Sequence, residues 1–509
     1  MIKGRHESTE PGQVAVPRRM ALTAVTCMAV SIALMVMLGL EGPSAGGRAM
    51  FAPSPPWPPW FFHAHQSIAL WSITLWLAEL LGGGGLILAL IAVRQGWRPP
   101  LRRLILGSVV AVVALVVVPP ADNGDPLYYA AYGRIAELGH SPYVMKPVQQ
   151  MPAADPIRAA VPFYQQDPPS RYGPVATGTQ AAASGLAGDS TARTIFWLKM
   201  WNALAYLGLV LALDRAVRSD AARRVRAHLL WSVNPLMLFA VLANGHNDVL
   251  AAVAGACALL VIKRVDSLRG LLAGVLLGLA TAIRVPYSLF GAGLAWAVRR
   301  SPRALAALIL GAAAVLVPSY MLFGPAAIKA TTTGLASGER PDLLWHDAAG
   351  LLGWQHAMAL TNILGVFAGA VLAAILLWRM PPGPRDFPAV RIALALSLGL
   401  LVAAPLQVPS YDAMIFPLLA VFPVTRLDWI IVARNAAMTA AAAPFIVRFD
   451  PEWLTAIERV STLGTPVVAV VAVDVALLWL CFTRAWTPTT GRRVAAVRAG
   501  VGTARSPAG

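Results

Sequence analysis

The chain has 509 residues, of which 57% are hydrophobic and only 13% charged. Ordinary soluble domains do not reach such values, so the composition excludes a soluble enzyme and predicts a protein with many membrane-spanning helices. The net charge of +17 would favour a nucleic-acid partner only if the basic side chains formed one face of a soluble fold. They lie instead in short segments between apolar stretches, so we expect no nucleic-acid partner.

The apolar stretches predict an all-α polytopic fold with about 14 transmembrane helices, in the range 12 to 14. Several stretches are shorter than the roughly 20 residues that a straight span needs, so the pairs around Pro286 and Gln407 could be re-entrant. The predicted spans are residues 20–40, 68–93, 104–118, 194–213, 229–243, 248–262, 270–283, 286–298, 304–323, 358–378, 392–406, 411–424, 429–446 and 462–482.

Most of the 41 Lys and Arg residues fall in segments that share one side of these spans. The positive-inside rule therefore places both termini in the cytoplasm. We predict a cytoplasmic N-terminal tail (1–19), a transmembrane domain (20–486) and a disordered cytoplasmic tail (487–509). Within the domain, 119–193 is the principal extracytoplasmic loop. The three cysteines fall inside predicted spans, so neither a disulfide framework nor metal-ligand spacing is expected.

The long loop contains a segment dense in carboxylates and tyrosines, which reads DNGDPLYYAAYGRIAELGHSPY from Asp122 onward. Asp125 before Pro126 is a helix start signal, because the carboxylate accepts from free N–H groups and proline loses no hydrogen bond there. We predict a short amphipathic helix from about Pro126 to Leu138, with Gly139 just past its end. Residues three and four apart share one face of that helix, namely Tyr128, Tyr132 and Ile135. A second helix, over 174–186, would lie at the membrane interface.

Three further outward turns carry polar groups at span ends. They contain Asn244-Gly245-His246-Asn247-Asp248, Arg284 shortly before Pro286, and Ser410-Tyr411-Asp412. Ionisable groups at membrane depth are costly unless paired or solvated, which makes each a functional candidate. The alternatives are that Asp248 and Asp412 cap the helices that follow and that Arg284 reaches the interface.

Carboxylates, arginines and a histidine on the outer side of a many-span protein suit group transfer from a lipid-phosphate donor. The attacking hydroxyl needs a general base and the departing phosphate needs cations. We predict Asp125 as the base, with Asp122 as the alternative. The candidates to hold the phosphate are Arg134, Arg171, His246 and Arg284. Further substrate-binding candidates are Tyr128, Tyr132, Tyr172, Asn247, Asp248, Tyr411 and Asp412.

The string Asp125-x-x-Tyr128-Tyr129-Ala130-Ala131-Tyr132-Gly133-Arg134, with Gly139-x-x-Pro142-Tyr143, resembles a signature of bacterial polyprenol-phosphate-mannose-dependent α-mannosyltransferases of the GT-C superfamily. Later segments are similar to further motifs of that family, namely Tyr172-Gly173-Pro174, Asn234-Pro235 and Gly245-His246-Asn247-Asp248. The resemblance covers roughly residues 105–420. Two departures are Arg284, where relatives often have lysine, and Ser141, where an acidic residue is usual.

The resemblance implies inverting transfer of mannose from a polyprenyl-phosphate donor to a glycan or lipoglycan acceptor. The enzyme would sit in a bacterial plasma membrane with its active site on the extracytoplasmic side. Asp125 matches the loop aspartate that serves as general base in the superfamily. No cofactor is predicted, and a divalent metal requirement stays open. The expected partners are the lipid-linked sugar donor, the acceptor and membrane lipid.

Two other classes fit the topology. A transporter or flippase for a lipid-linked glycan would need ionisable residues near the bilayer midplane. The sequence offers Glu79 and Asp474 within spans and Lys199 near an outer end, which is a small set for a coupled carrier. A polysaccharide ligase or polymerase would share the outer-face arginines. The transferase hypothesis requires Asp125, His246 and Arg284 to converge at one end of the helices.

Overall fold

The computed structural model describes residues 16–41, 57–62, 67–120, 125–161, 168–333, 358–403, 408–442 and 465–487. All regular secondary structure in these ranges is helical, and no strand occurs within them. The prediction of an all-α fold is therefore confirmed for the described part of the chain. Asp122, Gln407, residues 1–15 of the predicted N-terminal tail and residues 488–509 of the predicted C-terminal tail lie outside the described residues.

The helices follow one another in three groups. The first contains α1 (Val16–Leu40), α2 (Ile68–Arg94) and α3 (Leu101–Val116). Four helices of the long loop follow, α4 (Asp125–Glu137), α5 (Pro147–Gln150), α6 (Pro156–Ala160) and α7 (Pro174–Ala187). The remainder comprises α8 (Thr191–Ala216), α9 (Ala221–Ala227), η2 (His228–Ser232), α10 (Pro235–Met237), η3 (Leu238–Ala243), α11 (Asp248–Val261), α12 (Ser267–Ile283), η4 (Val285–Leu289), α13 (Phe290–Val298), α14 (Pro302–Phe323), α15 (Pro325–Thr333), α17 (Met358–Arg379), α18 (Val390–Ala403), η5 (Pro409–Met414), α19 (Phe416–Val421), α20 (Leu427–Ala442) and α22 (Thr465–Thr483).

Each of the fourteen predicted spans overlaps helical structure within the described residues. Five helical segments are long and apolar enough to cross a membrane, namely Arg18–Leu40, Ala69–Arg94, Thr191–Ala216, Ala221–Ala243 and Pro302–Phe323. Seven shorter apolar helices of 10–17 residues also occur among the described residues. The number of spans stays a prediction, because length and composition alone do not fix which short helices cross.

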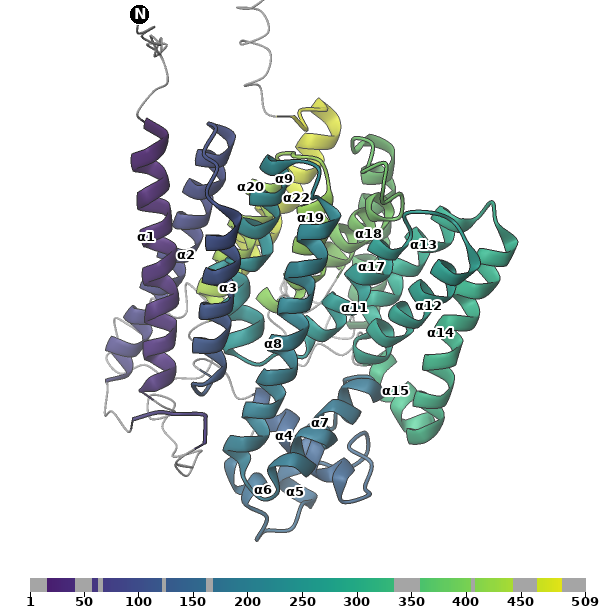
Figure 1. The fold of residues 1–509 in the computed structure, drawn as a ribbon. Helices are drawn as coiled ribbons and strands as arrows, with labels where there is room; N and C mark the ends of the chain where they lie inside the picture. Colours follow the sequence, from purple (N-terminus) through teal and green to yellow (C-terminus); the bar gives the residue numbers. More distant parts are fainter. Residues whose placement is uncertain are drawn as a thin grey trace, which may run out of the picture.

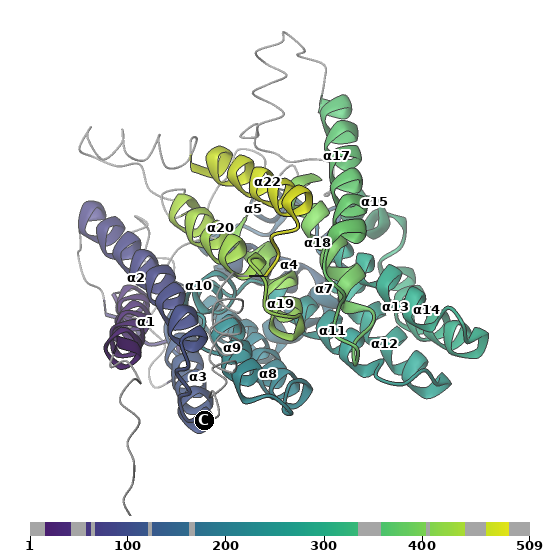
Figure 2. The same cartoon turned by 90° about the horizontal axis from the view of Figure 1, so that it is seen from above.

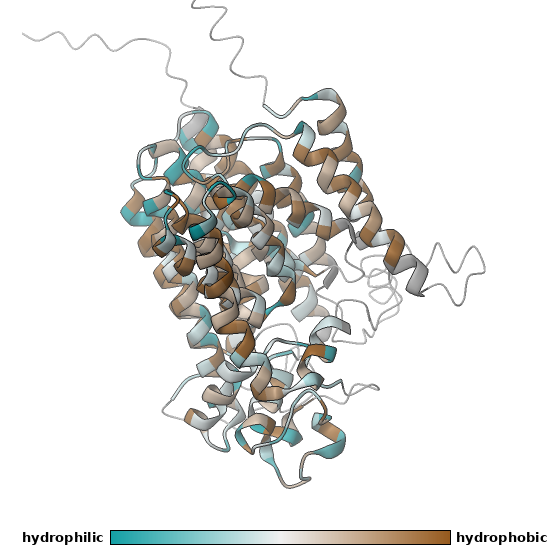
Figure 3. Ribbon diagram, turned by 90° about the vertical axis from the view of Figure 1, so that its right-hand side faces the viewer, coloured by the Kyte–Doolittle hydropathy of each residue, from teal (hydrophilic) through white to brown (hydrophobic). Residues whose placement is uncertain are grey.

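The long helices stand side by side, and α4, α5, α6 and α7 form a separate group at one end of them (Figure 1). This end is opposite to the start of α1. Seen along the helices, α1, α2 and α3 lie at one side and α12, α13 and α14 at the other (Figure 2). Apolar residues predominate along the long helices, and polar residues are more frequent at their ends and in the group of α4–α7 (Figure 3).

Close approach of small residues joins the first two helices. A Cβ atom on Gly82 would lie 2.7 Å from Ser31 Oγ, and one on Gly85 would lie 2.9 Å from Met28 Cγ. Such contacts need glycine, because any side chain would force α1 and α2 apart. The glycine run within the second predicted span therefore serves helix packing.

The helix α4 is fixed on two sides. Its residues Tyr128, Tyr132 and Ile135 are buried in a cluster with Ala183 of α7 and Leu198 of α8. Against α7 the approach is so close that a Cβ on Gly133 would lie 2.3 Å from the carbonyl oxygen of Gln180. This packing holds the start of α4, where Asp125 lies, against the ends of the long helices.

The bounds of the two predicted loop helices are close to those of helices in the structure. The helix α4 begins at Asp125, one residue before the predicted start, and ends at Glu137. Gly139 follows with φ +80°, a left-handed conformation that glycine adopts at helix ends without strain. The helix predicted over 174–186 is α7, which extends to Ala187. Its proposed place at a membrane interface stays a prediction.

Candidate functional site

The start of α4 faces the turn between η3 and α11. The Oδ2 atom of Asp125 lies 3.7 Å from Nδ1 of His246. The side chain of Asp125 is 48% exposed, whereas that of His246 is 13% exposed. The carboxylate is therefore accessible to a substrate on one side and adjacent to an imidazole on the other.

Two tyrosines continue this line of polar groups. The Oη atom of Tyr129 lies 3.2 Å from Nδ1 of His246 and 2.6 Å from Oη of Tyr172. Burial raises the pKa of the Tyr129 hydroxyl well above its usual value, and neighbouring Tyr172 and Asp125 raise it further. Burial also raises the pKa of Tyr172, although Arg284 opposes that shift. Both hydroxyls therefore keep their protons at neutral pH and can donate hydrogen bonds.

Arg284, between α12 and η4, lies next to Tyr172 and is the last member of this series of polar side chains. Its guanidinium carbon lies 4.9 Å from the ring centroids of both Tyr172 and Tyr411. Its Nε atom forms an ion pair with Oδ1 of the buried Asp248, at 3.0 Å. The stacked rings and the carboxylate fix the orientation of the guanidinium, and its Nη groups make no hydrogen bond to the described part of the chain.

The turn that carries His246 is held by α8 and by its own backbone. Asn202 of α8 donates from Nδ2 to the carbonyl oxygen of His246, at 3.1 Å. The N–H of His246 donates to the carbonyl oxygen of Val241, at 3.0 Å. Gly245 has φ +66°, in the left-handed region that favours glycine. These constraints hold the imidazole next to Asp125 and Tyr129 of α4.

Lys199 lies on the same helix, one turn before Asn202, and is fully buried. Its Nζ atom donates to the carbonyl oxygen of Val118, at 2.8 Å. A Cβ on Gly245 would lie 3.3 Å from Lys199 Cγ and 3.5 Å from Pro126 Cγ. Lys199 therefore packs against Gly245 of the turn that carries His246, close to Pro126 at the start of α4.

Several polar atoms around the turn are buried without a hydrogen-bond partner among the described residues. They are Asn202 Oδ1, Asn244 Oδ1, Asn247 Nδ2 and Asp248 Oδ2. Buried polar groups in native proteins are nearly always hydrogen-bonded, so such a group of atoms indicates a place for a polar ligand or water.

Arg171 lies near the aromatic part of the site. Burial lowers the pKa of its guanidinium, and the hydroxyls of Tyr132, Tyr172 and Tyr411 oppose that shift. Tyr132 itself donates to the carbonyl oxygen of Pro168, at 2.9 Å. Tyr128 is buried beside it, with the two ring centroids 6.0 Å apart. Arg171 therefore joins Arg284 near the site, whereas Tyr128 and Tyr132 pack in the loop core.

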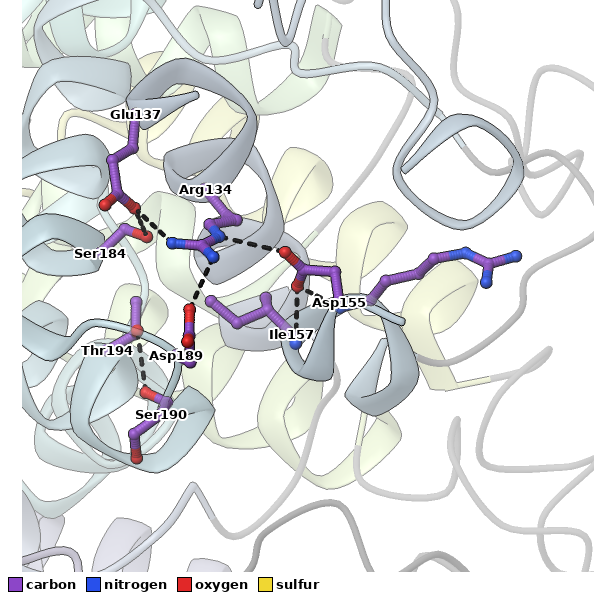
Figure 4. Close-up of polar contacts among 9 residues, drawn as sticks. Arg134, Glu137, Asp155, Ile157, Ser184, Asp189, Ser190 and Thr194 are labelled. Carbon is purple, nitrogen blue, oxygen red and sulfur yellow. Dashed lines mark hydrogen bonds and ion pairs between the residues drawn. The ribbon is translucent and has the colours of Figure 1, made fainter. Parts of the chain in front are cut away.

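Arg134 is surrounded by carboxylates within the group of helices α4–α7 (Figure 4). It pairs with Glu137 at 3.2 Å, Asp155 at 3.1 Å and Asp189 at 2.6 Å. Asp155 also accepts from the N–H groups that begin α6. The predicted role of Arg134 in phosphate binding is untested, and these ion pairs favour a structural role in joining α4, α6 and the start of α8.

Asp412 is fully buried on η5 and is paired with Arg434 of α20. Its other oxygen accepts from Asn435 Nδ2, at 2.9 Å. Its neighbour Tyr411 stacks on Arg284. Asp412 thus anchors the segment that presents Tyr411, and its predicted substrate contact is untested.

The structure brings together Asp125, His246, Asp248, Arg284, Tyr172 and Tyr411 from five separate segments. Residue Asp122, the alternative base, lies outside the described residues. Among the described residues no group of three or more His, Cys, Asp or Glu side chains is placed to hold a metal ion. No metal was predicted, and a divalent metal requirement was left open by the sequence and is untested.

Tyr129 is the site residue that the sequence analysis missed. The prediction selected Tyr128 and Tyr132 because they share a helical face, but that face is directed into the loop core. Tyr129 lies four residues after Asp125 and therefore on the face of α4 that carries the predicted base. That spacing was the available signal.

In its described part the chain is a helical membrane protein in which a carboxylate, an imidazole and a guanidinium lie together at one end of the helices. The comparison with known families narrows this description. Residues 26–300 match the N-terminal domain of the alpha-(1->6)-mannopyranosyltransferase family, and because the match covers more than half of the 509 residues, the chain belongs to that family.

Individual relatives are similar over shorter segments. The chain is 27% identical over 138 residues to a probable alpha-(1->6)-mannopyranosyltransferase of Mycolicibacterium smegmatis, which covers 27% of this chain and 25% of the relative. It is 24% identical over 139 residues to an alpha-(1->6)-mannopyranosyltransferase of Mycobacterium tuberculosis (27% and 24% covered) and over 137 residues to alpha-(1->6)-mannopyranosyltransferase B of Corynebacterium glutamicum (27% and 23% covered). The matched segment thus spans about a quarter of each relative. No solved structure matches the chain significantly.

Proposed function

We propose that the protein is a membrane glycosyltransferase that moves mannose from a polyprenyl-phosphate donor to a glycan or lipoglycan acceptor. The transfer takes place on the extracytoplasmic face and inverts the anomeric centre. The observation that carries this proposal is the convergence of the half-exposed Asp125 with His246 and, through two tyrosines, with Arg284. Membership of the alpha-(1->6)-mannopyranosyltransferase family supports mannose as the transferred sugar.

In this proposal Asp125 is the general base. Its carboxylate is accessible, so the acceptor hydroxyl can approach it and lose its proton as the new glycosidic bond forms. An inverting transfer needs the base and the leaving phosphate on opposite faces of the sugar. The two intervening tyrosines separate Asp125 from Arg284 and leave such an arrangement open.

Arg284 holds the leaving phosphate, with Arg171 as the second cation. The ion pair with Asp248 uses Nε, so the Nη groups of Arg284 can donate to two phosphate oxygens at once. Guanidinium is suited to this geometry. The unsatisfied atoms of Asn202, Asn244 and Asn247 are suited to the hydroxyl groups of a sugar.

Asp125→Asn is the test of the base. The amide keeps the shape of the side chain but cannot accept the proton, so transfer from radiolabelled polyprenyl-phosphate mannose into membrane glycan should fall by at least about 10²-fold. Expression and thermal stability in detergent should stay at the wild-type level. Wild-type transfer in the Asp125→Asn membranes would remove this carboxylate from the mechanism.

The same assay separates the alternatives. A flippase would move the labelled lipid without forming a new glycosidic bond, and a polymerase or ligase would transfer preassembled glycan instead of a single sugar. Washed membranes that carry the wild-type protein and form no new mannosidic product would overturn the proposed function itself. Competition by other lipid-linked sugars, such as arabinose, would identify the donor sugar.

A further inference from the structure

The Nδ1 atom of His246 has two polar neighbours. Asp125 Oδ2 lies 3.7 Å away on one side and the hydroxyl of Tyr129 lies 3.2 Å away on the other. The first distance is about 1 Å longer than a hydrogen bond, and catalytic hydrogen bonds of unliganded enzymes often shorten only in the substrate complex. The imidazole is therefore within reach of the carboxylate that faces the acceptor.

The surrounding contacts fix this ring in place. Its backbone is held by Asn202 and Val241, and Gly245 supplies the left-handed turn before it. Tyr129 is buried to 1% exposure and lies against Tyr172, whose ring is covered by Arg284. The imidazole thus lies between the buried Tyr129 hydroxyl and the half-exposed carboxylate of Asp125.

Resting on the transferase function proposed above, we propose that His246 and Asp125 form a proton relay and that Tyr129 positions the imidazole. The acceptor hydroxyl gives its proton to Asp125 while its oxygen forms the bond to the anomeric carbon. The bond from that carbon to the phosphate oxygen breaks, and its electron pair leaves with the polyprenyl phosphate. The proton then passes from Asp125 to Nδ1 of His246, which regenerates the carboxylate.

The tyrosine chain determines which nitrogen takes that proton. In the proposed relay Tyr172 donates to Tyr129 and Tyr129 donates to Nδ1 of His246, a direction that both contacts allow. In this arrangement Nδ1 carries a lone pair and the ring proton is on Nε2. When Nδ1 receives the proton, the Tyr129 hydroxyl rotates and accepts a hydrogen bond from it.

This role differs from phosphate binding, which the sequence alone allowed for His246. A phosphate ligand contributes to donor affinity, whereas a relay acts on the proton transfer and on the return of Asp125 to its ionised form. The two roles therefore predict different changes in KM and kcat.

The experiment uses full-length wild-type protein and the variants His246→Ala, Tyr129→Phe and Tyr320→Phe in membranes. We expect His246→Ala to lower kcat by about 10²–10⁴-fold, with the donor KM changed less than about threefold. Added imidazole should restore part of kcat in a dose-dependent manner. Tyr129→Phe should lower kcat by about tenfold. Tyr320→Phe, which removes a hydroxyl that donates a hydrogen bond to Thr331, is the matched control.

Three outcomes would overturn the relay. A donor KM raised more than tenfold with unchanged kcat would assign His246 to phosphate binding. A folded His246→Ala protein that imidazole does not activate would leave the ring with a structural role, and if that variant does not fold, a wild-type kcat in Tyr129→Phe contradicts the proposal. If wild type transfers mannose and Asp125→Asn does not, the proposed function stands whatever these variants show.

Discussion

The Nε atom of Arg284 lies 3.0 Å from Oδ1 of Asp248, and this ion pair joins the end of α12 to the start of α11. Asp248 is 2% exposed, so its charge depends on the guanidinium for compensation. The pair is therefore both a support for the turn that carries His246 and the anchor of the proposed phosphate-binding group.

Arg284→Gln should destabilise the protein by about 3–5 kcal/mol, because it leaves a buried carboxylate without its cation. The double variant Arg284→Gln/Asp248→Asn should recover most of that loss, since both charges are removed. Thermal unfolding in detergent measures the stability, and the transfer assay should show that the double variant is still inactive. Equal stability of the single and double variants would contradict the coupling.

Gly133 provides a test of the contact between α4 and α7. Gly133→Ala should cost about 1–3 kcal/mol and lower transfer, because a Cβ would lie 2.3 Å from the carbonyl oxygen of Gln180 and would push α4 away. Gly178→Ala on α7 is the control, since a Cβ there meets nothing within 4 Å. Unfolding midpoints in detergent should separate the two alanine variants clearly.

The ion pairs of Arg134 distinguish a structural from a substrate-binding arginine. Arg134→Gln should lower stability by about 2 kcal/mol, because the mostly buried Asp155 loses its charged partner. Asp189→Asn should change stability by less than about 1 kcal/mol, since Asp189 is 74% exposed. A donor KM raised tenfold in Arg134→Gln, without loss of stability, would instead support the phosphate role.

The sequence predicted the helices and the convergence of the site for physical reasons. Long apolar stretches indicate the helices. Because successive loops lie on alternating sides of the predicted spans, the turns at His246 and Arg284 are expected on the same side as Asp125. The polar groups at those turns were informative because ionisable side chains are rare at membrane depth. The locations of the helices and of the turns therefore followed from local pattern.

The partners of individual side chains did not follow from the sequence. Arg134 is paired with Asp155 and Asp189, which are 21 and 55 residues away. Asp412 is held by Arg434, which lies 22 residues further on. Such pairs depend on how helices pack, and helical periodicity gives the face of a residue but not what that face contacts. Tyr129 was missed for the same reason.

Two tyrosine rings, Tyr172 and Tyr411, contact the guanidinium of Arg284, and Tyr411 lies outside the segment 26–300 that matches the family. Tyr172 belongs to residues 26–300, whereas Tyr411 comes from η5 and depends on Asp412 and Arg434 for its position. A fragment that ends at residue 300 would expose one side of the guanidinium. A chimera that contains this site therefore has to include residues 409–435 together with residues 26–300. Without them, Arg284 would lose its contact with the Tyr411 ring.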